Sequence, residues 1–277
     1  YISTSSKLNV QIFVSQQIQH ELHHRSKQME NTNPFEKPLS KNEFNGYWIP
    51  SHNAKIMKKG LEENNAPFLP DASGNINAEP VYSLSTGKCL PANRLIPVQF
   101  EKMKTGYTSN LVASKSTISE LNTEIKDGEK GILYNFKGKD DNFHTAAFFF
   151  PEQTATPEVF NELAQEKIHP LDNLRDISIS IESSEPTEYL GTYVAACRSG
   201  MKLSVSPEIA QEFKDKIMAH VENDMKKADN RDKNIESVGT ILFNADKRGT
   251  EILKTLAQER SNDQAPQRKK EDMEVCF

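Results

Sequence analysis

Apolar residues recur at steps of three and four through the last third of this sequence. One such line runs through Ala245 and Gly249 and contains Ile235, Val238, Leu242, Ile252 and Leu256. Residues at this spacing share one face only in an α-helix, so the pattern predicts a long C-terminal helix with a heptad-like seam. The seam has two interpretations: it packs within its own domain, which is the commoner arrangement, or it is offered as a partner helix to another subunit.

Upstream, helical and extended patterns alternate. We expect helices at residues 8–28, 51–65, 116–125 and 157–168, and a second C-terminal helix from 207. The runs 131–137 and 144–150 are strand-like and predict an antiparallel hairpin. Ile177, Ile179 and Ile181 alternate with polar residues, which is typical of a half-buried strand. The more uniformly apolar run 190–198 is expected to be a central strand, with residues 201–205 after it.

These elements predict an α+β fold, in which a small mixed α/β domain precedes a strand-containing region and long C-terminal helices. Proline and charge patterns suggest four parts: an N-terminal helical arm at 1–34, a domain at 35–155, an α+β region at 156–260, and a disordered or partner-bound tail at 261–277.

Composition limits the classes of function. The net charge is −5 and 36% of the 277 residues are hydrophobic, so a nucleic-acid surface would have to be a local patch. No apolar run is long enough to span a bilayer, and membrane insertion is not expected. The three cysteines, Cys89, Cys197 and Cys276, form neither a close pair nor an even set, which favours the reducing cytoplasm.

Residues 80–155 contain an ordered series of short motifs. Thr86-Gly87-Lys88 forms a turn, Gly106-Tyr107 follows a helix, and Gly128-Glu129-Lys130-Gly131 precedes a strand and the Phe-rich run that ends in Gln153. With the helix and the "APFLPD" loop before it, the region of about 45–155 resembles the N-terminal domain of ArdC-type antirestriction proteins. The resemblance implies a domain that binds single-stranded DNA. Two departures are Phe68, where a tryptophan is common, and Pro97 within a helix.

The ArdC-type family usually adds a zincin-like peptidase domain with an H-E-x-x-H motif, and residues 156–277 have none. His20-Glu21-Leu22-His23-His24 does match that motif, and Glu43 has the spacing of a third zinc ligand. However, 19 residues precede the motif, which leaves little chain for an active-site sheet. A zinc site at His20, His24 and Glu43 is therefore a remote hypothesis, and we expect a solvated helix, no metal and no cofactor.

The segment "KDGEKGILYNFK" is the best candidate for contact with a partner. Basic side chains flank aromatic ones there, as in proteins that hold single strands by charge and base stacking. The candidate residues for binding nucleic acid or a partner are Lys126, Lys130, Tyr134, Lys137 and Lys139. Interleaved acidic residues, including Asp127 and Glu129, support the alternative of a solvated hairpin turn. Gly87 is expected to adopt a positive φ in a β-turn, because the earlier glycine of a phosphate-binding loop is missing.

The sequence thus favours a protein that is not an enzyme. The preferred function is a binding or adaptor subunit of an assembly related to conjugation or type IV secretion, with other protein subunits as partners. This association comes from the resemblance. The alternative is a single-stranded-DNA-binding antirestriction-type protein, and a zinc metallopeptidase is the remote alternative.

Overall fold

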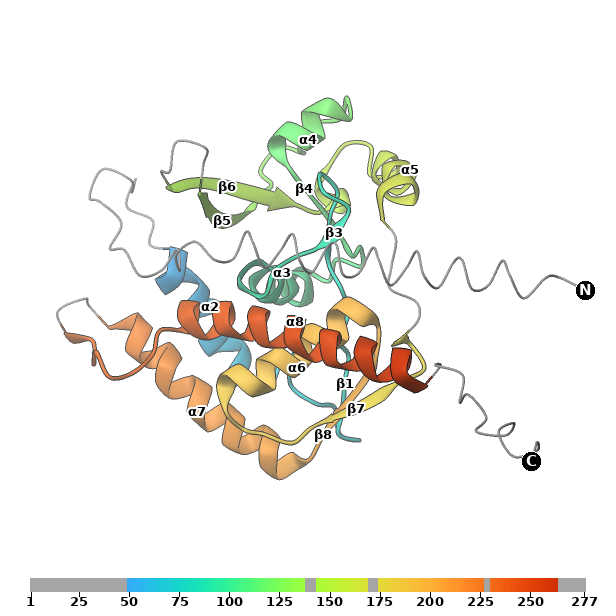
Figure 1. Ribbon diagram of the computed structural model, residues 1–277. Helices are drawn as coiled ribbons and strands as arrows, with labels where there is room; N and C mark the ends of the chain where they lie inside the picture. Colours follow the sequence, from blue (N-terminus) through green and yellow to red (C-terminus); the bar gives the residue numbers. More distant parts are fainter. Residues whose placement is uncertain (1–48, 138–142, 169–173, 227–229, 264–277) are drawn as a thin grey trace, which may run out of the picture. The chain divides into compact units, whose positions relative to one another are not determined.

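The computed structural model describes residues 49–137, 143–168, 174–226 and 230–263 (Figure 1). Contacts divide the chain into one unit of Thr32–Gly249 and another of Tyr1–Asn31 with Thr250–Phe277. In the second unit only the end of one helix is described. The expected N-terminal arm and residues 264–277 of the expected tail lie outside the described residues, whereas residues 261–263 belong to the last described helix.

The described elements mix helices with two sheets, which confirms the α+β class. The helices are α2 (Ile49–Glu62), α3 (Ala92–Thr105), α4 (Lys115–Glu120), α5 (Glu158–Lys167), α6 (Pro186–Ser199), α7 (Pro207–Met225) and α8 (Val238–Asp263), with a 3₁₀ turn η2 (Pro151–Gln153). The strands are β1 (Asn75–Ile76), β2 (Tyr82–Ser83), β3 (Lys88–Cys89), β4 (Leu111–Ser114), β5 (Ile132–Lys137), β6 (Phe143–Phe149), β7 (Ser178–Ile181) and β8 (Lys202–Val205). None of the described helices is long and apolar enough to cross a membrane.

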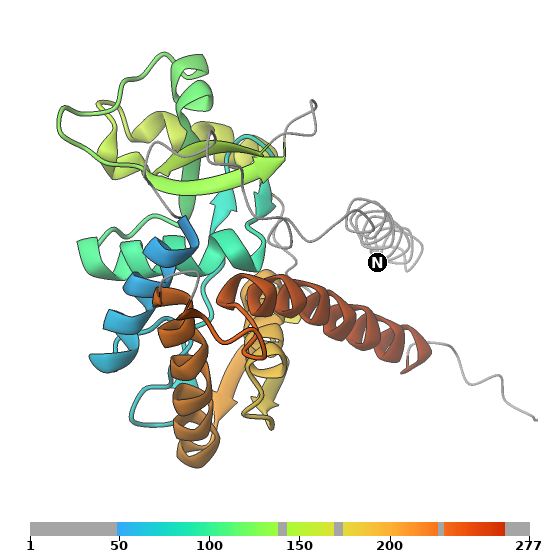
Figure 2. The same ribbon diagram turned by 90° about the vertical axis from the view of Figure 1, so that its left-hand side faces the viewer.

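A five-stranded sheet in the order β3-β2-β4-β6-β5 carries the candidate interface. Its β5 and β6 form the expected antiparallel hairpin, with Ile132 opposite Phe148 and Tyr134 opposite Ala146. Successive strand residues point to opposite faces, so Phe148 and Phe149 face different layers. In both views α3 lies on one side of this hairpin, with α4 and α5 on the other (Figures 1 and 2).

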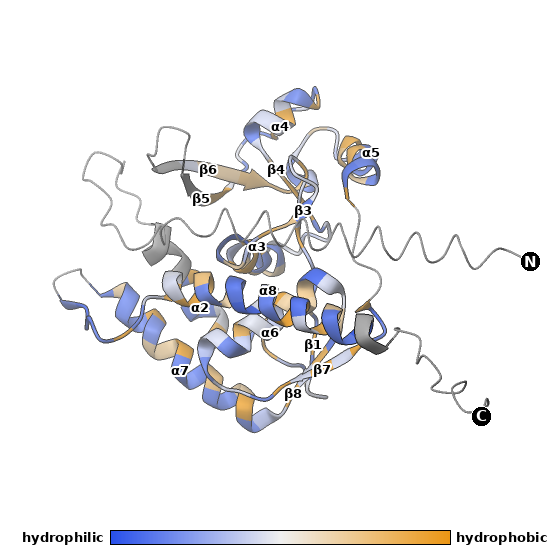
Figure 3. Ribbon diagram, in the orientation of Figure 1, coloured by the Kyte–Doolittle hydropathy of each residue, from blue (hydrophilic) through white to orange (hydrophobic). Residues whose placement is uncertain are grey.

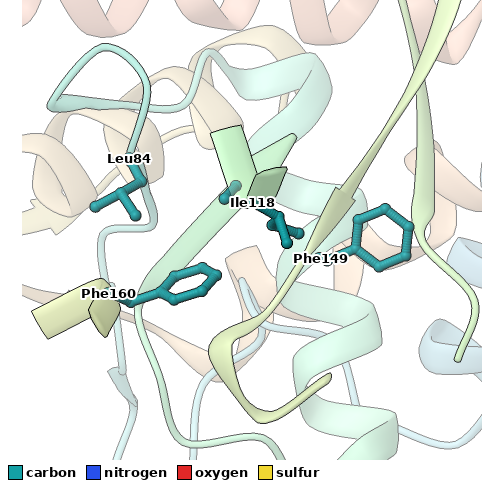
Figure 4. Close-up of a cluster of buried hydrophobic side chains, with 5 residues drawn as sticks. Leu84, Ile118, Phe149 and Phe160 are labelled. Carbon is teal, nitrogen blue, oxygen red and sulfur yellow. The ribbon is translucent and has the colours of Figure 1, made fainter. Parts of the chain in front are cut away.

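The face of the sheet towards α4 and α5 buries a small apolar cluster. It consists of Leu84, Ala113, Ile118, Phe149 and Phe160, and Figure 4 shows four of these side chains converging from different elements. Phe148, Phe149 and Phe150 are all buried, at 3%, 8% and 0% exposure. The triple phenylalanine is therefore core rather than an exposed stacking platform.

The second sheet has three strands in the order β1-β8-β7. Strand β7 confirms the alternation of isoleucines, and β8 confirms the strand expected at 201–205. Strand β1 pairs Asn75 with Ser204 and Ile76 with Leu203. The boundary expected at 155 therefore falls inside the unit Thr32–Gly249, because a strand from the earlier segment completes a sheet of the later one.

Phe68, in the "APFLPD" loop, is at the centre of the main core. Its ring meets Phe100, Tyr193 and Phe213 edge to face, with centroids 5.7, 6.2 and 5.6 Å away. The Tyr189 hydroxyl donates to the Phe68 carbonyl oxygen at 3.0 Å. The amphipathic face of α7 supplies Phe213, and Figure 3 shows hydrophobic and hydrophilic residues alternating along that helix.

The expected central strand at 190–198 is wrong, because these residues belong to helix α6. Pro186 occupies the first turn of α6, and Gly200 ends it in the left-handed region at φ 72°. Nearly the whole helix is buried, so polar residues do not mark one face of it. A short apolar run of this kind cannot be assigned to strand or helix from periodicity alone.

The first half of the predicted seam packs within the protein. Val238, Leu242 and Ala245 are buried, and a Cβ at Gly249 would lie 2.9 Å from the carbonyl oxygen of Gly191 in α6. The close helix approach that Ala245 and Gly249 permit is thus made by α6 of the same chain. Ile235 precedes α8 and is half-buried, as are Ile252 and Leu256 further along it.

Asp246 of α8 joins three helices. Its carboxylate accepts the backbone N–H of Ala92 at 2.8 Å, which caps α3, where Pro91 offers no side-chain cap. It also pairs with the guanidinium of Arg198 in α6, which donates in addition to the Asp246 carbonyl oxygen at 3.4 Å. Both side chains of the ion pair are below 10% exposed.

Asp246→Ala is expected to destabilise the protein by about 3–5 kcal/mol, because it leaves a buried guanidinium without its carboxylate. Urea unfolding measures the loss. The double variant Asp246→Ala/Arg198→Met should recover part of it, since no buried charge then remains alone. If the double variant loses as much stability as Asp246→Ala and Arg198→Met added together, the two side chains are not coupled.

Asp224 is expected to make stability depend on pH. Its carboxylate accepts the Val238 N–H at 2.9 Å where α8 begins, and burial raises the pKa of this carboxyl above its ordinary value of 3.8. The native state then holds the proton more tightly than the unfolded chain, so this group makes stability fall as pH rises from 3.8 through the raised value.

Asp224→Asn should remove that pH dependence and leave stability at pH 7 equal or higher, because the amide oxygen can still accept the Val238 N–H. Unfolding free energies at several pH values, with Asp215→Asn as an exposed control, measure this. A larger loss at pH 7 than at pH 4 would contradict the prediction.

Candidate nucleic-acid interface

The turn at residues 126–130 is held to η2 by a network centred on Gln153. The Gln153 side chain donates to Glu129 Oε2 at 2.8 Å and to the Lys130 carbonyl oxygen at 3.1 Å. Its own Oε1 accepts the Phe150 N–H at 2.9 Å. The backbone N–H of Lys126 also donates to the Gln153 carbonyl oxygen at 2.9 Å. Gly128 adopts a positive φ of 83° within the turn. Since Gln153 is 3% exposed, the turn is fastened to the core.

The network separates the charges of this turn. Glu129 is half-buried, and its carboxylate accepts the Tyr107 hydroxyl at 3.2 Å as well as the Gln153 amide. Burial, followed by the nearby Glu129, raises the pKa of the Tyr107 phenol. Lys126 and Lys130 are exposed, and Lys126 Nζ donates to the Glu152 carbonyl oxygen at 2.9 Å. One interleaved acid is thus turned inward while both lysines reach solvent.

Glu152 fastens the neighbouring loop to the same 3₁₀ turn. Its Oε1 accepts the N–H groups of Thr108 and Ser109 at 2.9 and 2.8 Å. The Tyr107 ring packs on Phe150 with centroids 5.2 Å apart. The surface around Lys126 and Lys130 is therefore built on hydrogen-bonded backbone rather than on a loosely held loop.

Tyr134 of β5 lies within a stack. Its ring is 4.0 Å from the Phe148 ring at an interplanar angle of 17°, and the guanidinium of Arg94 lies 4.7 Å from its centroid. The guanidinium cannot share the ring face that Phe148 covers, so the two groups occupy opposite faces. A base therefore cannot stack on Tyr134 in this arrangement, and any contact there must involve Arg94.

The remaining predicted residues are placed as follows. Lys137 is the last residue of β5, and Lys139 lies outside the described residues. His20, His24 and Glu43 also lie outside them. Within the described segments no group of three or more His, Cys, Asp or Glu side chains is arranged to hold a metal ion.

Gly87 adopts φ 66°, which confirms the expected turn at Thr86-Gly87-Lys88. A Cβ there would collide with the carbonyl group of Lys167 at the end of α5. The glycine is thus required both by its backbone conformation and by a close approach. The turn has a packing role, as expected from the missing glycine of a phosphate-binding loop.

Two residues of the interface, Arg94 and Gln153, are absent from the sequence-based prediction. Arg94 reaches Tyr134 from α3, about 40 residues away in the chain, and Gln153 reaches the turn from beyond the hairpin. Neither belongs to a local pattern of basic and aromatic residues. The only signal for Gln153 is its place at the end of the resemblance, which does not indicate a partner.

No protein-family model matches this sequence, and no curated protein matches it. Among solved structures, the chain is similar to the crystal structure of the antirestriction protein ArdC from the R388 plasmid in metal-free form. The alignment covers 78% of this chain and 99% of that chain, with 12% identity and a TM-score of 0.39. At this identity and score the similarity implies no activity for the present chain.

Gln153→Ala is expected to destabilise the protein by about 1–3 kcal/mol, because the Phe150 N–H and the Lys130 carbonyl lose their partner. Amide hydrogen exchange should accelerate at Phe150. Gln211→Ala on the exposed face of α7 is the matched control and should have little effect. Unchanged exchange at Phe150 would contradict the role given to Gln153.

Proposed function

We propose that this protein binds single-stranded DNA through the lysine turn at residues 126–130, in a role of binding rather than catalysis. The observation that carries the proposal is the separation of charge in that turn. Lys126 and Lys130 are exposed, while the Glu129 carboxylate is half-buried and hydrogen-bonded to Tyr107 and Gln153. The proposal corresponds to the antirestriction-type function implied by the resemblance of residues 45–155.

Charge is the physical basis of this proposal. A protein of net charge −5 gains little from its overall field, so a nucleic acid must be attracted by a local patch. The turn supplies such a patch because the Glu129 carboxylate is engaged internally, so that of its two acidic side chains only that of Asp127 is exposed beside the two exposed lysines. Its attachment to η2 through Gln153 means that little conformational entropy is lost when a strand binds.

Binding through the lysine turn would not depend on stacking against Tyr134. Both ring faces of Tyr134 are covered, by Phe148 and Arg94. Phosphate contacts carry no base information, so we expect weak sequence preference and strong salt dependence.

The adaptor function, in an assembly related to conjugation or type IV secretion, is the second candidate. Ile252 and Leu256 on α8 favour it, because both remain half-buried at the end of an apolar seam whose first half is packed internally. Their partner would be another protein subunit with a complementary apolar helix face. If this function is correct, Ile252→Glu and Leu256→Glu should each abolish binding of the partner subunit.

Titration of a labelled oligothymidylate of ~15 nucleotides at several salt concentrations tests the DNA-binding proposal. Lys126→Ala/Lys130→Ala should weaken binding and make the slope of log K against log salt shallower by about 0.7 for each phosphate that is no longer neutralised. The control is Lys55→Ala/Lys233→Ala, which removes the same charge from two exposed positions elsewhere.

Equal weakening in the two double variants would show that the lysine turn is not the site. Failure of the wild-type protein to bind, together with a partner subunit that no longer binds Ile252→Glu, would favour the adaptor function instead.

A further inference from the structure

The side chain of Arg94 differs in its pairing from those of two other helical arginines. Arg198 pairs with Asp246, and Arg248 donates to Glu188 Oε2 at 2.7 Å. The Arg94 side chain has no hydrogen bond or ion pair among the described residues, and its Nε is buried without a partner. Its guanidinium instead lies over the ring of Tyr134, 4.7 Å from the centroid.

Removing this guanidinium from water is unfavourable. Burial lowers the pKa of Arg94, and the opposing effects of Tyr134 and Asp246 are smaller. Asp246 cannot compensate fully, because its carboxylate already pairs with Arg198 and caps Ala92. A half-buried cation with an unsatisfied donor is destabilising, and stacking on one ring offsets only part of that effect.

The position of Arg94 fits a role in binding. Tyr134, which the guanidinium covers, is four residues from Lys130 along the same chain segment. The Tyr134 ring is itself fixed by its stack on Phe148, so the ring over which the guanidinium lies is held in place. A planar, oriented guanidinium is suited to the oxygen atoms of a phosphate group.

We propose that Arg94 is an anion-binding residue whose ligand is a phosphate group, and that it extends the nucleic-acid interface from the lysine turn across β5 to α3. This inference rests on the proposed function for the source of the phosphate, a phosphodiester of single-stranded DNA. A DNA phosphodiester and free phosphate present the same kind of oxygen atom to the guanidinium. Inorganic phosphate is therefore the second probe, beside the oligonucleotide.

The test compares Arg94→Met and Arg94→Lys in the full chain. Arg94→Met should bind the oligothymidylate about tenfold more weakly, the value of one charge-assisted hydrogen bond. Its urea midpoint should be unchanged or higher, because an uncompensated buried charge has been removed. Arg94→Lys retains the positive charge without the planar guanidinium and should bind with an affinity between those of the wild type and Arg94→Met.

Two results would overturn the inference. If Arg94 has only a structural role, Arg94→Met lowers both the urea midpoint and the affinity for the oligothymidylate. Unchanged binding in Arg94→Met would also overturn it.

An NMR experiment separates this inference from the proposed function. The Arg94 Nε–H resonance, assigned by its absence in Arg94→Lys, should shift on adding either the oligonucleotide or inorganic phosphate. A shift with inorganic phosphate but no DNA binding would support the anion site and refute the DNA-binding function. DNA binding that depends on Lys126 and Lys130 but leaves this resonance unmoved would refute the Arg94 inference alone.

Discussion

The buried pairing of Asp246 with Arg198 is the constraint on which the rest of the unit Thr32–Gly249 depends. The same carboxylate caps the first N–H of α3, so one side chain fixes α8, α6 and the start of α3 together. Helix α3 then presents Arg94 to the β5–β6 hairpin. An ion pair of this kind is not a large net source of stability, but it is specific, because any other arrangement leaves buried charge without a partner.

The candidate interface follows from a similar use of buried polar groups. Gln153 is almost fully buried, and it both orders the lysine turn and engages the Glu129 carboxylate, one of the two acidic groups of that turn. Arg94 is the opposite case, a partly buried cation whose Nε–H has no hydrogen-bond acceptor within the described part of the chain. Hydrogen-bonded groups define the shape of this surface, and the Arg94 guanidinium, which has no hydrogen-bond partner among the described residues, indicates where a ligand is needed.

Periodicity predicted those elements that have one buried and one polar face. The β5–β6 hairpin, β7, α5 and α7 are recognisable because polar residues mark the face away from the core. Helix α6 is misassigned from its sequence because it is buried on nearly all sides. Within the candidate site, Lys126, Lys130 and Tyr134 belong to a local run of basic and aromatic residues. Arg94 and Gln153 do not, because their partners are distant in sequence and a single polar residue does not reveal a long-range contact.

The sequence by itself determined the α+β class, the positive φ of Gly87 and the amphipathic elements, since these depend on steric limits and on spacing along one segment. Tertiary structure decided that the α8 seam meets α6, that β1 completes the sheet of β7 and β8, and that Glu129 turns inward. It also decided that both faces of Tyr134 are covered. These outcomes depend on which distant groups share a buried space, where unpaired charges and hydrogen-bonding groups are costly, and no local pattern encodes that choice.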